Sequence, residues 1–146
     1  MFSRSRSNGR APKVIVCDDK PHIRNLISDH LTQIGYEVRI AKDGQECLNE
    51  FANDMPDAMI LDLKMPRVNG IEVIRALRKQ NATMPILVLS GFHDLGHEVD
   101  SKELSLGVFA GKPFRLNEVT ELLEKALRRM KHSTGSDIEI PGGIER

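Results

Sequence analysis

The amino-acid sequence predicts an α/β fold in which a parallel sheet is covered by helices on both faces. Short apolar segments alternate along the chain with segments whose apolar residues recur every three or four positions, as strands alternate with amphipathic helices. The strand-like segments are apolar almost throughout, which is typical of parallel strands that are buried on both sides. Right-handed crossover connections then require helices on both faces of the sheet.

The expected elements follow one another in a regular order. The expected strands are Lys13–Cys17, Tyr36–Ile40, Ala58–Leu61, Pro85–Leu89 and Val108–Ala110. Pro21 is expected in the first turn of the first helix, whose apolar face includes Ile23, Leu26, Ile27, Leu31 and Ile34. Asp43-Gly44 starts the second helix, and the other two begin before Ile71 and before Val119. Between Gly91 and Gly107 the helical pattern is weak because glycine interrupts it and the apolar residues keep no steady period.

Length and composition favour one soluble domain. The chain has 146 residues, of which 40% are hydrophobic and 29% are charged. No apolar run approaches the roughly 20 residues that a membrane span needs, and the basic start lacks the apolar region of a secretory signal. We expect a disordered basic tail over 1–12, a folded cytoplasmic domain over 13–131 and a flexible tail over 132–146.

Charge and cysteine content exclude several classes of protein. The formal net charge is zero, but the first residues are basic and the remaining body is acidic on balance. An acidic body argues against direct nucleic-acid binding, which needs a basic face. Cys17 and Cys47 lie in apolar segments without a C-x-x-C motif, so we expect two reduced core cysteines and no metal site built from cysteine.

Polar residues follow four of the five expected strands. Asp18 and Asp19 follow the first strand, Asp62 the third and Ser90 the fourth, and Lys112 comes shortly after the fifth. In a parallel sheet these positions meet at the carboxyl edge, where reactive groups collect. The sequence therefore predicts one functional site made of these side chains.

Three carboxylates at one edge repel one another and call for a counter-charge, which Mg²⁺ supplies near phosphate. We predict Asp19 and Asp62 as direct ligands, Asp18 as a ligand or a residue that holds a bound water, and the backbone carbonyl of Lys64 as a further oxygen donor. Asp62 would be the nucleophile that forms an acyl phosphate. Lys112 and Ser90 would contact the phosphoryl oxygens.

Each of these residues also has a simpler interpretation. Asp18-Asp19 alone could begin a helix, Ser90 could be a loop hydroxyl and Lys112 could belong to a turn. For Asp43 and Asp57 we accept capping or turn roles. The convergence of several strand ends on one edge favours a functional site over these separate explanations.

Four motifs occur in the chain: V-I-V-C-D-D, P-D-A-M-I-L-D-L-K-M-P-R-V-N-G, L-V-L-S-G and G-K-P-F. By these motifs the chain resembles the response regulator receiver domain over roughly Lys13–Met130. The resemblance implies a doubly wound, flavodoxin-like fold with five strands in the order 2-1-3-4-5. It also implies phosphorylation of Asp62 by a sensor histidine kinase, a phosphotransfer protein or a small phosphodonor. Ser90 and Phe109 would form a switch pair, and Lys112-Pro113 a cis peptide that aims the lysine.

Three positions near the expected site differ from the usual pattern of the family or flank the phosphoryl group. Gly91 replaces the commoner alanine and, having no side chain, leaves the phosphate approachable. Lys64 and Phe92 lie two residues after Asp62 and Ser90. We expect a cation and a bulky ring there to hinder the attacking water and to slow the loss of the phosphoryl group.

The leading hypothesis is a phosphorylation-controlled binding switch, not an enzyme, that an unidentified protein target reads. A phosphorelay intermediate that passes the phosphoryl group to a histidine-containing partner is the alternative. A phosphatase typically needs a second acid where Lys64 stands, and an unphosphorylated scaffold would not need the complete site. We expect no membrane partner; a phosphorylation-dependent homodimer is compatible with the sequence but not indicated by it. The sequence is equally compatible with a stand-alone regulator and with part of a longer one.

Overall fold

The structure is a computed structural model that describes residues 10–65, 67–80, 84–90, 107–111 and 115–132. Its strands are β1 (Lys13–Cys17), β2 (Glu37–Ala41), β3 (Ala58–Asp62), β4 (Ile86–Ser90) and β5 (Gly107–Gly111). Its helices are α1 (Pro21–Gln33), α2 (Gly44–Asn53), α3 (Gly70–Lys79) and α4 (Leu116–His132). All neighbouring strands are parallel, in the order β2-β1-β3-β4-β5, which confirms the predicted fold.

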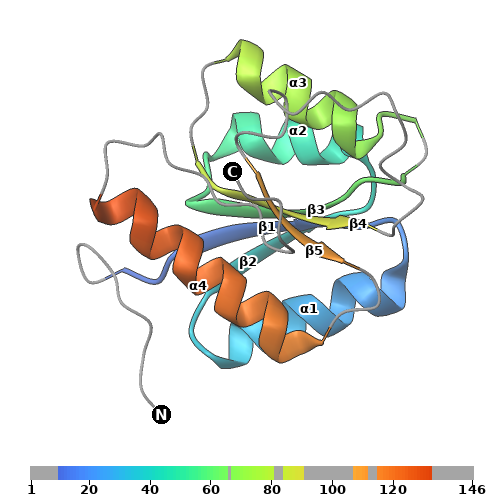
Figure 1. The fold of residues 1–146 in the computed structure, drawn as a ribbon. Coiled ribbons are helices and arrows are strands. Elements are labelled where there is room, and N and C mark those ends of the chain that lie inside the picture. Colours follow the sequence, from blue (N-terminus) through green and yellow to red (C-terminus); the bar gives the residue numbers. More distant parts are fainter. Residues whose placement is uncertain (1–9, 66, 81–83, 91–106, 112–114, 133–146) are drawn as a thin grey trace.

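Helices cover both faces of the sheet, with α2 and α3 on one side and α1 and α4 on the other (Figure 1). Residues of β1 alternate between the two apolar cores that result. Ile15 and Cys17 pack with α2 and α3, whereas Val14 and Val16 pack with α1 and α4. Burial on both faces explains why the central strands are apolar throughout.

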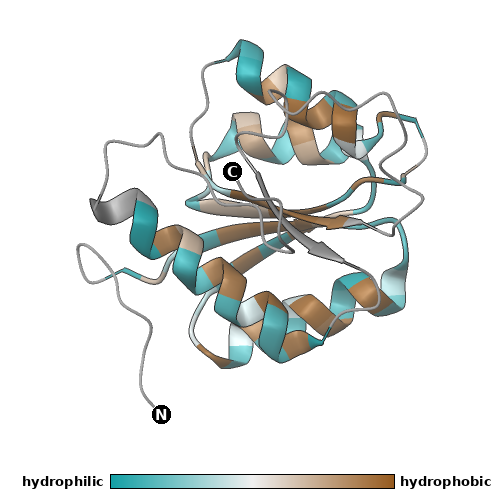
Figure 2. Ribbon diagram, in the orientation of Figure 1, coloured by the Kyte–Doolittle hydropathy of each residue, from teal (hydrophilic) through white to brown (hydrophobic). Residues whose placement is uncertain are grey.

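The helices turn their apolar residues toward the sheet and their polar residues outward (Figure 2). In α1 the buried side chains are Ile27 and Leu31, whereas Leu26 is 49% exposed. The expectation that Leu26 belongs to the inner face was therefore wrong. Successive residues of a helix point about 100° apart, so Leu26 lies beside the buried face that contains Ile27 and Leu31.

A membrane-spanning helix would have to be longer and more apolar than any helix in the described part of the chain.

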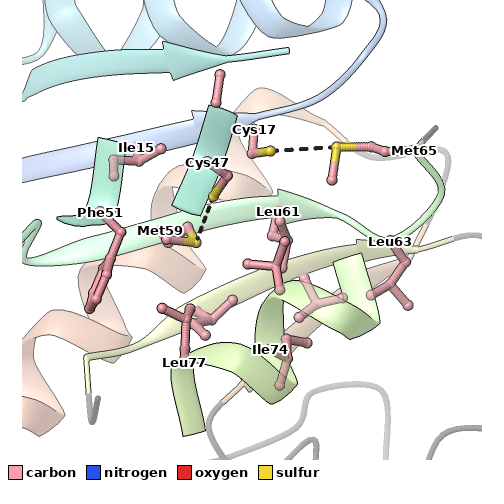
Figure 3. Packing of buried hydrophobic residues seen from close by; sticks show 14 of the residues in the cluster. Ile15, Cys17, Cys47, Phe51, Met59, Leu61, Leu63, Met65, Ile74 and Leu77 are labelled. Carbon is pink, nitrogen blue, oxygen red and sulfur yellow. Dashed lines mark hydrogen bonds between the residues drawn. The ribbon is translucent and has the colours of Figure 1, made fainter. Parts of the chain in front are cut away.

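Both cysteines are free and buried, as predicted. The sulfur of Cys17 lies 3.4 Å from Met65 Sδ, and that of Cys47 lies 3.4 Å from Met59 Sδ (Figure 3). A hydrogen bond with Cys47 and burial together raise the pKa of the Cys17 thiol, which keeps it protonated and unreactive. Met65 follows β3, so its contact with Cys17 holds the loop after β3 against the end of β1.

The first residue of α2 lies directly against the loop that follows β3. A Cβ added to Gly44 would overlap the carbonyl oxygen of Val68 and would lie 2.6 Å from its carbonyl carbon. Both contacts are with backbone, which cannot move aside as the end of a flexible side chain can. Glycine is therefore required at position 44, because the start of α2 and the backbone of Val68 lie too close for any side chain. This contact fixes the position of the loop after β3.

We predict that Gly44→Ala destabilises the protein by about 1–3 kcal/mol, as overpacking does elsewhere. Alanine favours a helix over glycine by only about 1 kcal/mol, which does not offset the overlap with Val68. Urea denaturation measures the change. Gln45→Ala, at the next and exposed position of the same helix, is the matched control and should change stability little. A Gly44→Ala variant as stable as the wild type would contradict the argument.

Candidate functional site

The strand register brings the ends of β1, β3, β4 and β5 to one edge of the sheet. Cys17 of β1 pairs with Leu61 of β3, so Asp18 follows its strand beside Asp62. On the other side of β3, Asp62 pairs with Leu89, and Ser90 is the next residue of β4. Ser90 in turn pairs with Gly111, the last residue of β5.

Three carboxylates converge at this edge. Asp62 is fully buried and Asp18 is 1% exposed, whereas Asp19 is partly exposed. One carboxylate oxygen from each residue lies within 4.8 Å of the others. An all-oxygen donor set of this kind fits a hard divalent cation such as Mg²⁺. The residues present are therefore able to hold the ion that the sequence predicts.

Backbone groups orient the two buried carboxylates. The Lys64 N–H donates to Asp62 Oδ1 over 3.3 Å, and the Lys20 N–H donates to Asp18 Oδ1 over 2.9 Å. The N-cap of α1 is Lys20, and the first turn contains no acidic residue. Asp18 and Asp19 thus precede the helix, so their simpler interpretation as its N-cap and first-turn acid is wrong.

Lys20 is a residue of the site that the sequence reasoning did not identify. Its ammonium nitrogen lies 3.1 Å from Asp62 Oδ2, 3.4 Å from Asp19 Oδ1 and 3.5 Å from Asp18 Oδ1. Burial alone would lower the pKa of Lys20. The hydrogen bond to Asp62 and the charges of the three carboxylates outweigh burial and raise that pKa above its usual value. The lysine is therefore fully charged at neutral pH.

The loop after β3 is anchored to the start of α2. Asp43 is the N-cap of α2 and accepts a hydrogen bond from the Glu46 N–H over 2.9 Å, which confirms its predicted capping role. Its other oxygen forms an ion pair with Arg67, which has a φ of 64°, an unfavourable region for a residue other than glycine. The ion pair thus helps to hold a strained turn five residues after Asp62.

Asn69 and Glu72 close the same loop at the start of α3. Each side chain accepts a hydrogen bond from the backbone N–H of the other, which forms a capping box. The Gly70 N–H donates to the Leu63 carbonyl over 3.0 Å. A Cβ on Gly70 would lie 2.7 Å from the Asp62 carbonyl oxygen, so α3 begins directly against the residue that carries the central carboxylate.

Several predicted site residues are not tested by this geometry. Gly91, Phe92 and Lys112 lie outside the described residues. Ser90 and Phe109 lie in β4 and β5, but the structure describes only their backbone. Their proposed roles, and that of the Lys64 carbonyl, therefore stay predictions. For Asp57, the Oδ2 atom accepts from the Lys13 N–H over 2.8 Å at the opposite edge of the sheet, in keeping with its predicted structural role.

A scan against family models matches residues 14–124 to the response regulator receiver domain. The chain belongs to this family, whose members are the receiver domains of two-component systems. It is 35% identical over 132 residues to the probable transcriptional regulator ycf27 of Guillardia theta, a match that covers 90% of this chain and 52% of that protein. Response regulator MprA of Mycobacterium sp. strain KMS is 36% identical, over 86% of this chain and 54% of its own. The chain thus spans about half the length of these curated relatives.

Solved structures of receiver domains share the fold. The Francisella response regulator 1452 receiver domain has a TM-score of 0.72 and 30% identity, with 82% of this chain and 98% of that one covered. Response regulator TrrA of Thermotoga maritima, solved in complex with Mg²⁺ and BeF, has a TM-score of 0.70 and 30% identity, over 79% of this chain and 98% of that one. The family thus defines a signalling domain.

Asp43→Asn should lower the stability of the protein by about 1 kcal/mol or less at neutral pH, because it removes the charge paired with Arg67 but keeps an N-cap. The hydrogen bond from the Glu46 N–H and the pairing with Arg67 lower the pKa of Asp43. This contribution is therefore present above the ordinary aspartate pKa of about 3.9 and is lost as pH falls through the lower folded-state value. Urea denaturation from pH 7 to pH 3 should show the difference between wild type and variant shrinking with acidity; a constant difference would contradict the assignment. Asp43→Ala, which also removes the cap, should cost about 1 kcal/mol more at pH 7.

Proposed function

We propose that Asp62 accepts a phosphoryl group in a Mg²⁺-dependent reaction and that the modified domain then binds a protein target. The observation that carries this proposal is the buried Asp62 carboxylate at the end of β3, with Asp18 and Asp19 within metal-binding distance of it. Gathering three acids in one place, two of them buried, costs free energy that a purely structural role would not repay. A Mg²⁺-dependent phosphoryl transfer would give each of the three carboxylates a role.

The transfer follows from the chemistry of the central carboxylate. An ionised oxygen of Asp62 attacks the phosphorus atom of a phosphohistidine on a sensor histidine kinase or phosphotransfer protein. A new O–P bond forms, the N–P bond breaks, and the imidazole nitrogen keeps the electron pair and takes up a proton. The product is an acyl phosphate. The hydrogen bond from the Lys64 N–H to Oδ1 holds the carboxylate in one orientation during the attack.

Asp18, Asp19 and Asp62, together with the carbonyl of Lys64, would hold Mg²⁺. When bound, the ion neutralises the charge that the phosphoryl oxygens share with the carboxylates. Lys112, the hydroxyl of Ser90 and the backbone at Gly91 would contact the remaining phosphoryl oxygens, since Ser90 ends β4 at this edge and Gly91 and Lys112 come next in the sequence after β4 and β5. Each of these residues acts by position and charge, because phosphoryl transfer needs little else from the protein.

The output of the domain would come from the face around β5 and the segment between Gly91 and Gly107. On phosphorylation, Ser90 would move toward the phosphoryl group and Phe109 would turn inward, which changes the surface that a target protein contacts. We propose a cytoplasmic protein as this target, with no direct nucleic-acid contact, because the body of the chain is acidic on balance.

Incubation with acetyl phosphate and Mg²⁺ should add one phosphoryl group to the wild-type protein, detected as intact mass and removed by hydroxylamine. Asp62→Asn should show no adduct, because it lacks the nucleophilic oxygen anion. Asp29→Asn, an exposed change on α1, is the matched control and should be modified like the wild type. EDTA should abolish the adduct. An adduct that persists in Asp62→Asn would place the acceptor elsewhere and contradict the proposal.

The phosphoryl group should be lost faster when the two flanking residues become smaller and neutral. We predict that Lys64→Asn together with Phe92→Ala raises the rate of loss about 3-fold to 10-fold, which corresponds to about 1 kcal/mol of barrier. The decay of the adduct after removal of acetyl phosphate measures this rate. Lys79→Asn, an exposed lysine at the end of α3, serves as the control. Unchanged decay in the double variant would show that these residues do not hinder water.

A further inference from the structure

We infer that Lys20 is a built-in counter-ion that competes with the divalent cation for the acidic cluster, so that this chain binds Mg²⁺ more weakly than its three carboxylates alone would. The inference rests on the proposed function, because it concerns the same metal site. It adds a specific residue that sets how much Mg²⁺ the domain needs.

The ammonium nitrogen of Lys20 lies between 3.1 and 3.5 Å from an oxygen of each of the three carboxylates. A lysine ammonium has three N–H donors, so one group can serve all three acids at once. Mg²⁺ binds oxygen at about 2.1 Å and demands a nearly octahedral set of ligands. An ion bound to these oxygens and an ammonium held by the same oxygens would lie too close for both to stay.

The charges of the carboxylates also bear on the free energy of Mg²⁺ binding. Asp18 and Asp62 are almost fully buried, so their negative charges are poorly solvated and repel each other. Lys20, with its side chain 41% exposed, pairs with both of them and brings a positive charge within 3.5 Å of an oxygen of each. Any incoming cation must displace a charge that is already paired. The binding free energy of Mg²⁺ is therefore reduced by the cost of breaking those contacts.

The ammonium group of Lys20 can leave the acidic cluster without disturbing α1. Lys20 is the N-cap of α1, and its backbone N–H and carbonyl are held by Asp18 and by the Arg24 N–H. These bonds do not involve the ammonium group. The flexible side chain can therefore swing into solvent without any change in the helix. Lys20 thus works as a removable counter-ion and not as a fixed part of the fold.

The test compares Lys20→Met, which keeps an unbranched side chain of nearly the same length but removes the charge, with Lys20→Arg, which keeps a charge. Lys13→Met is the matched control, since Lys13 pairs with Asp54 over 3.0 Å at the opposite end of β1. Titration calorimetry with Mg²⁺, and Mn²⁺ binding followed by electron paramagnetic resonance, measure affinity without any phosphoryl transfer. Thermal melting in EDTA and in saturating Mg²⁺ measures stability.

Lys20→Met should bind Mg²⁺ about 3-fold to 10-fold more tightly than the wild type. Its melting temperature should fall in EDTA and recover in Mg²⁺, because the ion then balances the carboxylates. Lys20→Arg and Lys13→Met should keep an affinity near that of the wild type. In addition, the side-chain Cε signal of Lys20 in nuclear magnetic resonance should sharpen on Mg²⁺ addition as the side chain becomes mobile, whereas that of Lys13 should not change.

Two results would overturn the inference, and only the second of them would also overturn the proposed metal site. Equal Mg²⁺ affinity in wild type and Lys20→Met would reduce Lys20 to a structural ion pair, while the proposed metal site would stand. The absence of Mg²⁺ and Mn²⁺ binding in both proteins would overturn the inference together with the metal part of the proposed function.

Discussion

Two carboxylates, those of Asp18 and Asp62, are held out of water at the carboxyl edge of the sheet, and much of the surrounding structure compensates for this. An ionised carboxylate without a partner in such a place would be very costly. Here the backbone N–H groups of Lys20 and Lys64 donate hydrogen bonds to the two carboxylates, and the ammonium group of Lys20 pairs with Asp62. The three acids share the Lys20 ammonium, and an oxygen of each lies within 4.8 Å of the others. Such a set of carboxylate oxygens suits a divalent cation and a phosphoryl group that arrives with it.

The loop after β3 is the second constraint, since it has to hold the Asp62 carboxylate in place at the end of β3. The contact of Met65 with Cys17 ties it to β1, and the ion pair of Arg67 with Asp43 ties it to α2. At its far end, the loop passes into α3 where Gly70 lies against the backbone of Asp62 and Leu63. These anchors come from three different elements, so the position of the central carboxylate depends on the packing of the whole α2–α3 face. Stability and function are therefore linked at this loop.

The sequence allowed the fold and much of the site to be predicted, because both depend on patterns that are local in the chain. The alternation of strand-like and helix-like segments predicted a sheet with helices on both faces. The position of Asp62 at the end of an apolar strand predicted a site residue without any knowledge of the tertiary structure. Lys20 was missed because a lysine after two aspartates looks like an ordinary surface residue, and only the meeting of β1 with β3 brings Asp62 to it. The neighbouring Asp-Asp-Lys run was the one available signal.

The Arg67–Asp43 ion pair joins residues far apart in sequence, so no local pattern could reveal it. Leu26 was wrongly assigned to the core because spacing alone does not fix the width of the buried stripe.

A crystal structure of the protein with Mg²⁺ and beryllium fluoride, which mimics a phosphoryl group, would test the role of Asp62 most directly. We expect beryllium bonded to an Oδ atom of Asp62, the magnesium ion bound by the carboxylates at the ends of β1 and β3, and the ammonium of Lys20 moved away from Asp62. Beryllium fluoride at any other residue would contradict the assignment of Asp62 as the phosphoryl acceptor. Lys20 still paired with Asp62 beside a bound magnesium ion would contradict the competition between the two cations.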